Sequence, residues 1–423
     1  MSYHPLFDLF AVVGLTVTVI GFTPALSPLR TACLPLLMAS TWHCLSNCPG
    51  YISRSSWASA VGGYTLSSLL HYLDVAVLSG WSFELHGPAR DLIRGTTTTH
   101  VAPSSSTKII SLESQQLQLI ARIKFGFSVF FSWRFINTPY QVRNVPRLDA
   151  KLRSSRARFL VDTAVTIMIC YLVLDIMDSS SDAEVTDKFY SLEKIGVFSR
   201  IRDVSLEELV MRFFAAAGLC AGLVSFQRGV YSILAFVCVA TSLSTPDDWP
   251  PFNGPLLHTY SLRYFWSTFW HQTNTHRLNV MSYYLLHDML RLKRGSKLVR
   301  YMRIWLIFLI SGIWHVAIDF SSGISPRHSG ALRFFPVQPL GIIIEDMILM
   351  PRTANSRLEK PTPTIARRVL GLLWVSLWMA WTAPGYLYPI MDKSGSPDDD
   401  GVVPISIVNY LRHALTLLLP ARV

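Results

Sequence analysis

Ten apolar segments constrain this chain more than any other feature, because nearly all of them approach the length that a helix needs to cross a lipid bilayer, Thr31–Trp42 being short. A crossing takes about 20 residues at a rise of about 1.5 Å per residue. The segments are Leu6–Gly21, Thr31–Trp42, Ala58–Leu78, Phe159–Met177, Glu207–Ser225, Gly229–Leu243, Tyr301–Phe320, Phe335–Met350, Arg367–Trp381 and Pro404–Leu419. This pattern predicts an all-α, polytopic integral membrane protein with about eight to ten transmembrane helices.

The composition favours the same class. Charged residues make up 15% of the 423 residues, against roughly 25% in soluble globular proteins, and the mean hydropathy is +0.33. These values argue against a soluble helical protein and against a disordered chain. Cys44 and Cys48 have no second Cys/His pair at ligand spacing, so we expect no metal site.

The basic residues divide the chain into three regions. Residues 82–158 hold twelve Lys/Arg and four Asp/Glu, a net charge of +8, within an overall net charge of +11. Lys and Arg collect in cytoplasmic loops, so we expect this region to be cytoplasmic rather than a nucleic-acid-binding module. Residues 1–81 then form N-terminal spans, and residues 159–423 form a larger membrane-embedded region.

One part of this topology is inconsistent. Two full spans between Glu207 and Leu243 place residues 244–300 on the side opposite to the basic loop, although Arg291–Arg300 is itself a basic cluster that favours the cytoplasm. A re-entrant or interfacial segment near 207–243 or 279–292 would remove the conflict, and the sequence does not choose between these two places.

The densest unusual stretch is Tyr264–Arg277, which reads YFWSTFWHQTNTHR. An interfacial aromatic belt is one interpretation, but such belts do not need His271, Gln272 and Arg277 beside them. The alternative is a binding site, in which aromatic faces hold a flat or amphipathic ligand and the imidazole and amide supply oriented hydrogen bonds. The aromatic candidates are Phe265, Trp266, Phe269 and Trp270.

A second candidate is His315, which stands alone in a segment without formal charge from Ile304 to Ile318. Ionisable groups within spans are costly and usually functional, although a structural histidine is the alternative. Ser311 and Gly312 lie one turn earlier and leave room for a substrate or a second backbone. A hydrocarbon environment favours the neutral imidazole, the form that a general base requires.

Other polar groups within apolar segments are His71, Asp74, Glu345 and Asp346. A proton-coupled transporter could use them, but packing against basic residues of neighbouring helices is the commoner role, and we interpret Glu345 and Asp346 as structural or tunnel-lining. The sequence contains no phosphate-binding glycine loop and no G-x-S-x-G motif, so it offers no nucleophilic serine at such a motif.

Four motifs in order resemble the fungal branch of the wax synthase-like group within the membrane-bound O-acyltransferases. FWSTFWHQ begins at Phe265, and SGIWH places His315 44 residues after His271. PYQVRNVPRL at Pro139–Leu148 and QPLGIIIED at Gln338–Asp346 are similar to two further motifs of that branch. One departure is Ser267, where the branch usually has glycine.

The resemblance implies a chemistry and places its catalytic region within residues 159–423. An acyl group, most plausibly acetyl from acetyl-CoA, would pass to a hydroxyl of a terpenoid or other lipophilic secondary metabolite in the endoplasmic reticulum. His315 would be the general base, and His271 with Gln272 would hold the thioester or its oxyanion. The aromatic side chains and Ser311 would line the substrate site, and Arg277 with the Arg291–Arg300 cluster would meet the phosphates of coenzyme A.

Two alternatives remain, a long-chain wax ester synthase and, from a different class, a membrane transporter. The transporter hypothesis gives no reason for FWSTFWHQ. We expect acyl-CoA as a co-substrate, no permanently bound cofactor and no nucleic-acid partner, and the sequence does not predict the oligomeric state.

Overall fold

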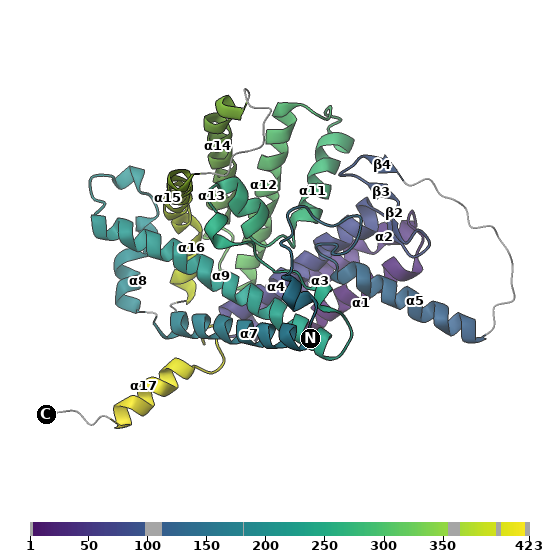
Figure 1. Cartoon of the computed structure of the whole chain (residues 1–423), viewed down its shortest axis with the longest axis horizontal. Coiled ribbons are helices and arrows are strands. Elements are labelled where there is room, and N and C mark those ends of the chain that lie inside the picture. The colour runs from purple at the N-terminus through teal and green to yellow at the C-terminus, as the bar shows by residue number, and fades with distance from the viewer. Residues whose placement is uncertain (1–2, 98–111, 181, 354–363, 395–398, 419–423) are drawn as a thin grey trace. The chain divides into compact units, whose positions relative to one another are not determined.

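The computed structural model describes residues 3–97, 112–180, 182–353, 364–394 and 399–418 (Figure 1). Helices account for nearly all of its regular secondary structure, which confirms the predicted all-α class. The chain forms two compact units. The first contains residues 1–52, 58–142 and 273–323, and the second contains residues 53–57, 143–272 and 324–423.

The first unit is built on the N-terminal helices. Their bounds are α1 (Leu6–Phe22), α2 (Pro28–Ala32), α3 (Leu34–Tyr51), α4 (Ser55–Tyr72, whose first turn belongs to the second unit) and the π-helix η1 (Leu73–Leu78). Helix α1 packs against α3 and α5, and α3 also packs against α12. The core between them includes Val12, Ile20, Leu37, Tyr72 and Phe135, all of which are buried.

The basic region of residues 82–158 contains more regular structure than a loop. It holds the short pairs β1 (Trp81–Ser82) with β2 (Gly87–Pro88) and β3 (Arg90–Asp91) with β4 (Thr96–Thr97), together with α5 (Leu112–Phe131) and α6 (Ala150–Arg153). Both strand pairs are antiparallel. Helix α5 was not predicted, because its polar residues interrupt the apolar run that marks a span. The first unit is completed by α11 (Thr275–Tyr283), η7 (Tyr284–Met289) and α12 (Lys297–Ser321).

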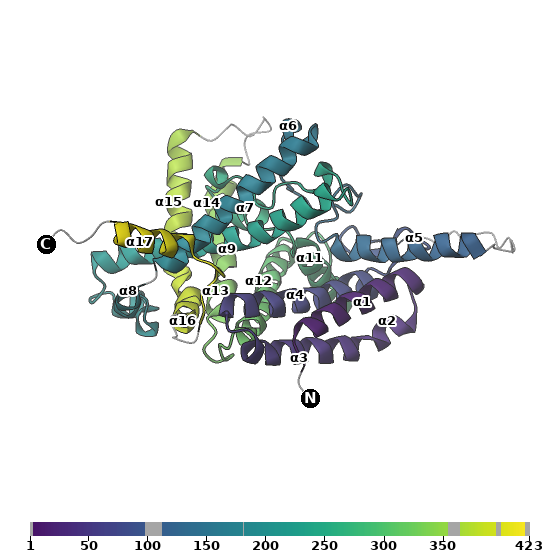
Figure 2. The same ribbon diagram turned by 90° about the horizontal axis from the view of Figure 1, so that it is seen from below.

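The second unit is built around α7 (Arg156–Ser179) and α9 (Leu206–Ala240), which lie side by side in Figures 1 and 2. Two glycines of α9 face α7: a Cβ at Gly222 would lie 3.2 Å from the end of the Met177 side chain, which is a tight contact, and one at Gly229 would meet Cys170 at an ordinary contact distance of 3.4 Å. The chain segment that connects α7 to α9 contains three short helices, namely α8 (Ala183–Phe189), η2 (Leu192–Lys194) and η3 (Phe198–Arg200).

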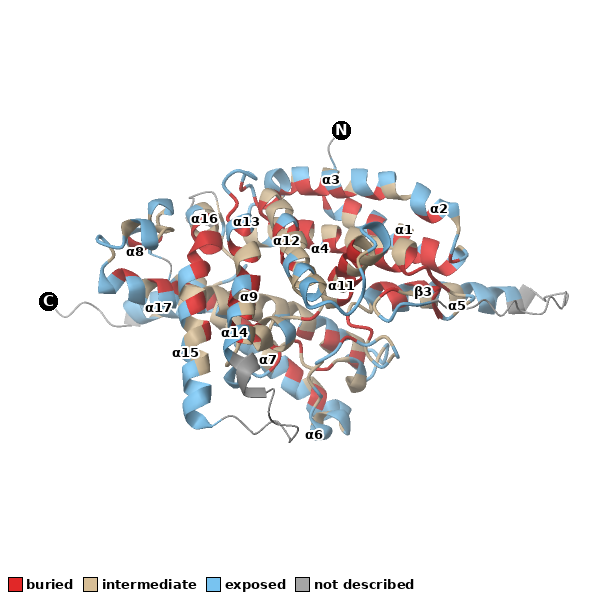
Figure 3. Ribbon diagram, turned by 90° about the horizontal axis from the view of Figure 1, so that it is seen from above, coloured by how far each residue is buried: buried red, intermediate tan, exposed pale blue. Residues whose placement is uncertain are grey.

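The rest of the second unit consists of short turns and C-terminal helices. The turns are η4 (Pro246–Asp248), η5 (Leu256–His258), α10 (Leu262–Tyr264), the π-helix η6 (Phe265–Phe269), α13 (Ala331–Phe334) and η8 (Phe335–Val337). The helices are α14 (Gln338–Thr353), α15 (Ile365–Thr382), α16 (Pro384–Ser394) and α17 (Ile407–Leu418). Exposed residues, pale blue in Figure 3, run along α3 and α15, as expected of helices that contact lipid.

Three helices in the described part of the chain are long and apolar enough to cross a bilayer, namely α7, α9 and α12. Helices α7 and α12 each coincide with one predicted span, whereas α9 covers two of them, and the predicted total of eight to ten stays a prediction. Apolar side chains on their surfaces suit a lipid environment; Phe214 and Leu234 of α9, for example, are 61% and 51% exposed.

Helix α9 corrects the sequence analysis at one point. Glu207–Ser225 and Gly229–Leu243 were predicted as two spans, but they form one continuous helix of 35 residues. The Ser205 hydroxyl caps its first turn by accepting from the Glu208 amide. A single crossing by this helix would place residues 244–300 on the same side as the basic loop and would remove the topological conflict without a re-entrant segment.

The two compact units cut across the three regions drawn from the sequence. Residues 1–81 and part of 82–158 share a unit with residues 273–323, whereas the rest of 159–423 lies mostly in the other unit. The three regions describe membrane topology rather than packing, and they stay a prediction.

Candidate active site

The aromatic motif begins at the α10–η6 turn of the second unit, and two polar residues fix that turn. The Ser261 hydroxyl accepts from the Tyr264 amide at 3.0 Å. Glu345 of α14 accepts from the backbone amides of Leu262 at 2.5 Å and Arg263 at 3.2 Å. The motif Q-P-L-G-I-I-I-E-D is therefore hydrogen-bonded to the short helix α10, which leads directly into the motif F-W-S-T-F-W-H-Q.

Glu345 and Asp346 were predicted to be structural or tunnel-lining, and their contacts favour a structural role. Glu345 also accepts from the Trp374 indole at 2.9 Å, and Asp346 forms an ion pair with Arg263 at 2.7 Å. Both carboxylates bind the residues immediately before Phe265, so they position the aromatic motif.

The four aromatic candidates divide into two pairs. Phe265 and Phe269 are buried in the protein, whereas Trp266 and Trp270 are half-buried. The Phe265 ring stacks on Trp270 with ring centroids 5.8 Å apart. The ring centroids of Trp266 and Phe334 lie 6.0 Å apart. The phenylalanines therefore support the turn, and the tryptophans are the more exposed pair.

His271 and Gln272 follow the aromatic turn and differ in their surroundings. His271 is half-buried and stacks on Phe252 with centroids 6.1 Å apart. Gln272 is 1% exposed, and its amide nitrogen donates to the backbone oxygens of Asn144 at 2.8 Å and Ser267 at 3.2 Å. Because carbonyls only accept, the orientation of this amide is determined. Its Oε1 atom is buried and accepts no hydrogen bond from the described residues.

His315 lies on α12 in the first unit. Its Nδ1 is 2.7 Å from the backbone oxygen of Ser311, one turn earlier. A carbonyl oxygen only accepts, so Nδ1 carries the proton, and the neutral ring then has its lone pair on Nε2. Ser311 therefore contributes through its backbone and fixes the tautomer that a base needs.

Arg277 lies on α11 of the first unit and is 1% exposed. Its guanidinium donates to the backbone oxygens of Ser67 at 2.5 Å and Thr273 at 3.2 Å, and it lies 4.3 Å from the centroid of the Trp133 ring. Burial lowers the pKa of Arg277 to about 9, while the charge of Asp74 opposes that shift. The side chain stays charged at neutral pH. These contacts favour a positioning role, and the contact with coenzyme A stays a prediction.

One polar pair escaped the sequence analysis. His71 and Asp74 were noted together, but the Asp74 carboxylate is hydrogen-bonded to Nδ1 of His276 at 2.7 Å, and His71 contacts the Val129 carbonyl oxygen at 3.0 Å. His276 stands within the aromatic-rich stretch, so its position was the available signal. Its partner was not visible because Asp74 lies 202 residues away in the sequence.

The predicted site residues therefore belong to two groups. The four aromatic residues, His271 and Gln272 lie in the second unit, and Arg277, Ser311 and His315 lie in the first. Within the described residues, no three His, Cys, Asp or Glu side chains are arranged to bind a metal ion.

The protein is helical, carries an aromatic turn followed by His271 and Gln272, and has a histidine with a fixed tautomer in α12. These features are typical of a membrane enzyme, and comparison with known proteins identifies its family. The membrane bound O-acyl transferase family matches residues 249–337, which contain both His271 and His315. Acetyltransferase aurG of Calcarisporium arbuscula is 31% identical over 385 residues, covering 90% of this chain and 91% of that protein.

Two further relatives agree. Acetyltransferase ataH of Aspergillus terreus is 34% identical over 279 residues, 64% of this chain and 90% of that protein. Acetyltransferase fsoF of Humicola fuscoatra is 26% identical over 370 residues, 84% of this chain and 88% of that protein. The chain belongs to the membrane-bound O-acyltransferase family and is an acyltransferase, as the motifs predicted. No solved structure matches it.

Proposed function

We propose that the enzyme transfers an acetyl group from acetyl-CoA to a hydroxyl of a terpenoid or related secondary metabolite at the membrane of the endoplasmic reticulum. The observation that carries this proposal is the similarity to fungal proteins named acetyltransferases along almost the whole chain. The half-buried Trp266 and Trp270 support a bulky, rigid acceptor, because flat indole faces pack against ring systems better than against a flexible alkyl chain.

In the proposed mechanism His315 is the general base. Its Nε2 takes the proton of the acceptor hydroxyl while the hydroxyl oxygen attacks the thioester carbonyl carbon. The resulting tetrahedral intermediate expels the thiolate of coenzyme A, and the proton on His315 passes to that sulfur. The carbonyl of Ser311 keeps the ring in one tautomer throughout.

His271 and Gln272 receive different roles. Both amide hydrogens of Gln272 are already donated to backbone carbonyls, so the side chain offers its buried Oε1 as an acceptor for a substrate N–H or O–H group. His271 is then the residue proposed to donate to the oxyanion. A single preorganised donor of this kind contributes about 2.7–4 kcal/mol to transition-state stabilisation.

The test is incubation of microsomes containing the protein with labelled acetyl-CoA and palmitoyl-CoA, against hydroxylated terpenoids and fatty alcohols, with products read by mass spectrometry. The proposal predicts acetyl esters of terpenoid alcohols. Palmitoyl transfer to hexadecanol without acetyl transfer would establish the wax synthase instead. Uptake of a substrate without ester formation would favour the transporter.

A further inference from the structure

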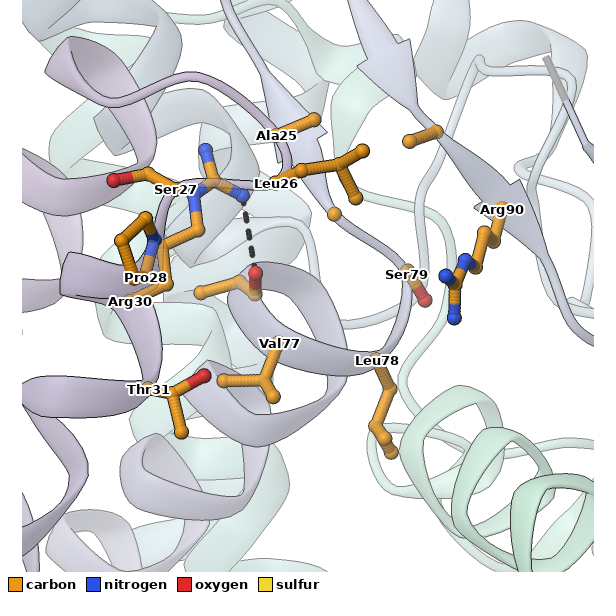
Figure 4. Close-up of a pocket in the computed structure, with 13 residues that line it drawn as sticks. Ala25, Leu26, Ser27, Pro28, Arg30, Thr31, Val77, Leu78, Ser79 and Arg90 are labelled. Carbon is orange, nitrogen blue, oxygen red and sulfur yellow. Dashed lines mark hydrogen bonds between the residues drawn. The ribbon is translucent and has the colours of Figure 1, made fainter. Parts of the chain in front are cut away.

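A cavity of about 180 Å³ lies in the first unit, between the segment that joins α1 to α3 and the end of η1 (Figure 4). Two arginines and three hydroxyl-bearing side chains line it, namely Arg30, Arg90, Ser27, Thr31 and Ser79. The cavity is smaller than the roughly 300–1,000 Å³ of sites for drug-sized ligands. Its size therefore suits a single small polar group.

Arg30 is a buried charge that forms no ion pair with a described residue, although the charge of Glu84 acts on it from beyond ion-pair distance. It is 2% exposed, and its guanidinium donates to the Thr23 hydroxyl at 2.9 Å, the Thr23 carbonyl at 2.8 Å and the Ala76 carbonyl at 3.1 Å. All three acceptors are neutral, and no carboxylate of the described residues forms an ion pair with it. A guanidinium has five N–H groups, so two remain for another acceptor. Burial of an unpaired charge is costly, and an anion in the cavity would offset that cost.

Arg90 lies at the other side of the cavity in the view of Figure 4. Its backbone amide donates to the backbone oxygen of Ser79 at 3.0 Å, which fixes β3 beside the end of η1. The residue is exposed, and its side chain forms no ion pair within the described part of the chain. The cavity thus has one positive charge that is held in place by hydrogen bonds and a second, exposed one among its lining residues.

We propose that this cavity binds a phosphate group, with Arg30 and Arg90 as its two cationic contacts. Arginine binds phosphate through paired N–H donors, and the hydroxyls of Ser27 and Thr31 are able to donate to the remaining phosphate oxygens, whereas the Ser79 hydroxyl already donates to Asp74 at 3.0 Å. Two sources carry this chemistry at a membrane. One is the coenzyme A part of the donor, a source that rests on the proposed function, and the other is the headgroup of an anionic phospholipid.

The experiment compares Arg90→Ala with Arg94→Ala in the full-length protein in nanodiscs. Arg94→Ala is a matched control, because this substitution removes the same charge from the same segment. The Arg94 side chain is 61% exposed and does not line the cavity. The probes are adenosine 3′,5′-bisphosphate in phosphatidylcholine discs and, separately, phosphatidic acid incorporated into the discs. Binding is measured by calorimetry for the nucleotide and by native mass spectrometry for the lipid.

We expect Arg90→Ala to weaken binding of one probe about tenfold relative to Arg94→Ala, the effect of losing one charge-assisted contact. Weaker nucleotide binding assigns the cavity to coenzyme A, and weaker lipid binding assigns it to a phospholipid. Equal binding of both probes by the two variants would overturn the proposal. Neither readout needs turnover, so a protein that binds phosphate but transfers no acetyl group would refute the proposed function alone.

Discussion

Replacing His315 by alanine tests the role of the imidazole most sharply. The ring is half-buried on a helix that has no formally charged residue from Ile304 to Ile318, so no neighbouring side chain of that stretch can replace it as a base. Its Nδ1 bond to the Ser311 carbonyl fixes the reactive tautomer. The substitution removes the base and leaves the Ser311 carbonyl oxygen without the imidazole. This loss should not destabilise α12, because the same oxygen also accepts a backbone hydrogen bond within the helix.

The expected loss is that of general base catalysis, about 10²–10⁴ in rate, or about 3–5.5 kcal/mol of activation free energy. The assay is transfer of labelled acetyl groups by microsomes adjusted to equal protein level. The acceptor KM should change little, since the proposed proton transfer develops only in the transition state.

His287→Ala is the control variant. His287 belongs to the same unit and its Nδ1 also lies 2.7 Å from a backbone oxygen, that of Leu292, but it stands outside the acyltransferase motifs. We expect nearly full activity from it. A His315→Ala protein that keeps more than a third of wild-type activity, or a His287→Ala protein that loses as much, would refute the assignment of the base.

Three further predictions follow from the site and the fold. His271→Ala should lower kcat more than it raises the acceptor KM, and His271→Asn should keep part of the activity because an amide still donates; an unchanged kcat with a raised KM would make His271 a substrate-positioning residue instead. Glu345→Gln places an N–H group against the amides that the carboxylate now accepts, so kcat should fall about tenfold at unchanged protein level, and loss of the protein from the membrane would contradict a positioning role. If α9 crosses once, a cysteine at Ser296 should react with an impermeant maleimide on the same side of sealed microsomes as a cysteine at Ser154. Reaction of the Ser296 cysteine on the side where a cysteine at Ser199 reacts would contradict a single crossing by α9.

The spans were the most predictable part of the fold, because hydropathy alone marks a helix that contacts lipid. Phe159–Met177 and Tyr301–Phe320 were placed within four residues of the ends of α7 and α12. The continuity of α9 was not predictable in the same way. The polar stretch before Gly229 resembles a turn, but Gln and Arg are good helix formers, and Gly229 is accommodated by packing on Cys170.

The site was predictable in its residues but not in its contacts. Motif spacing singled out His271, Gln272 and His315, yet the partners of the site residues are backbone atoms or distant side chains. The bond from Gln272 to the Asn144 carbonyl joins two motifs that are 128 residues apart. Glu345 was predicted to be structural or tunnel-lining, but its bonds to the start of the aromatic turn depend on tertiary packing, which a hydropathy pattern does not encode.

The most direct test of the proposed activity measures acetyl and palmitoyl transfer by the same microsomes to one hydroxylated terpenoid, with His315→Ala as the blank. The account predicts an acetyl ester that forms with the wild-type protein and is lost with the variant. Formation of the acetyl ester at equal rates by both proteins would contradict catalysis by His315, and transfer of palmitoyl alone would contradict the choice of donor.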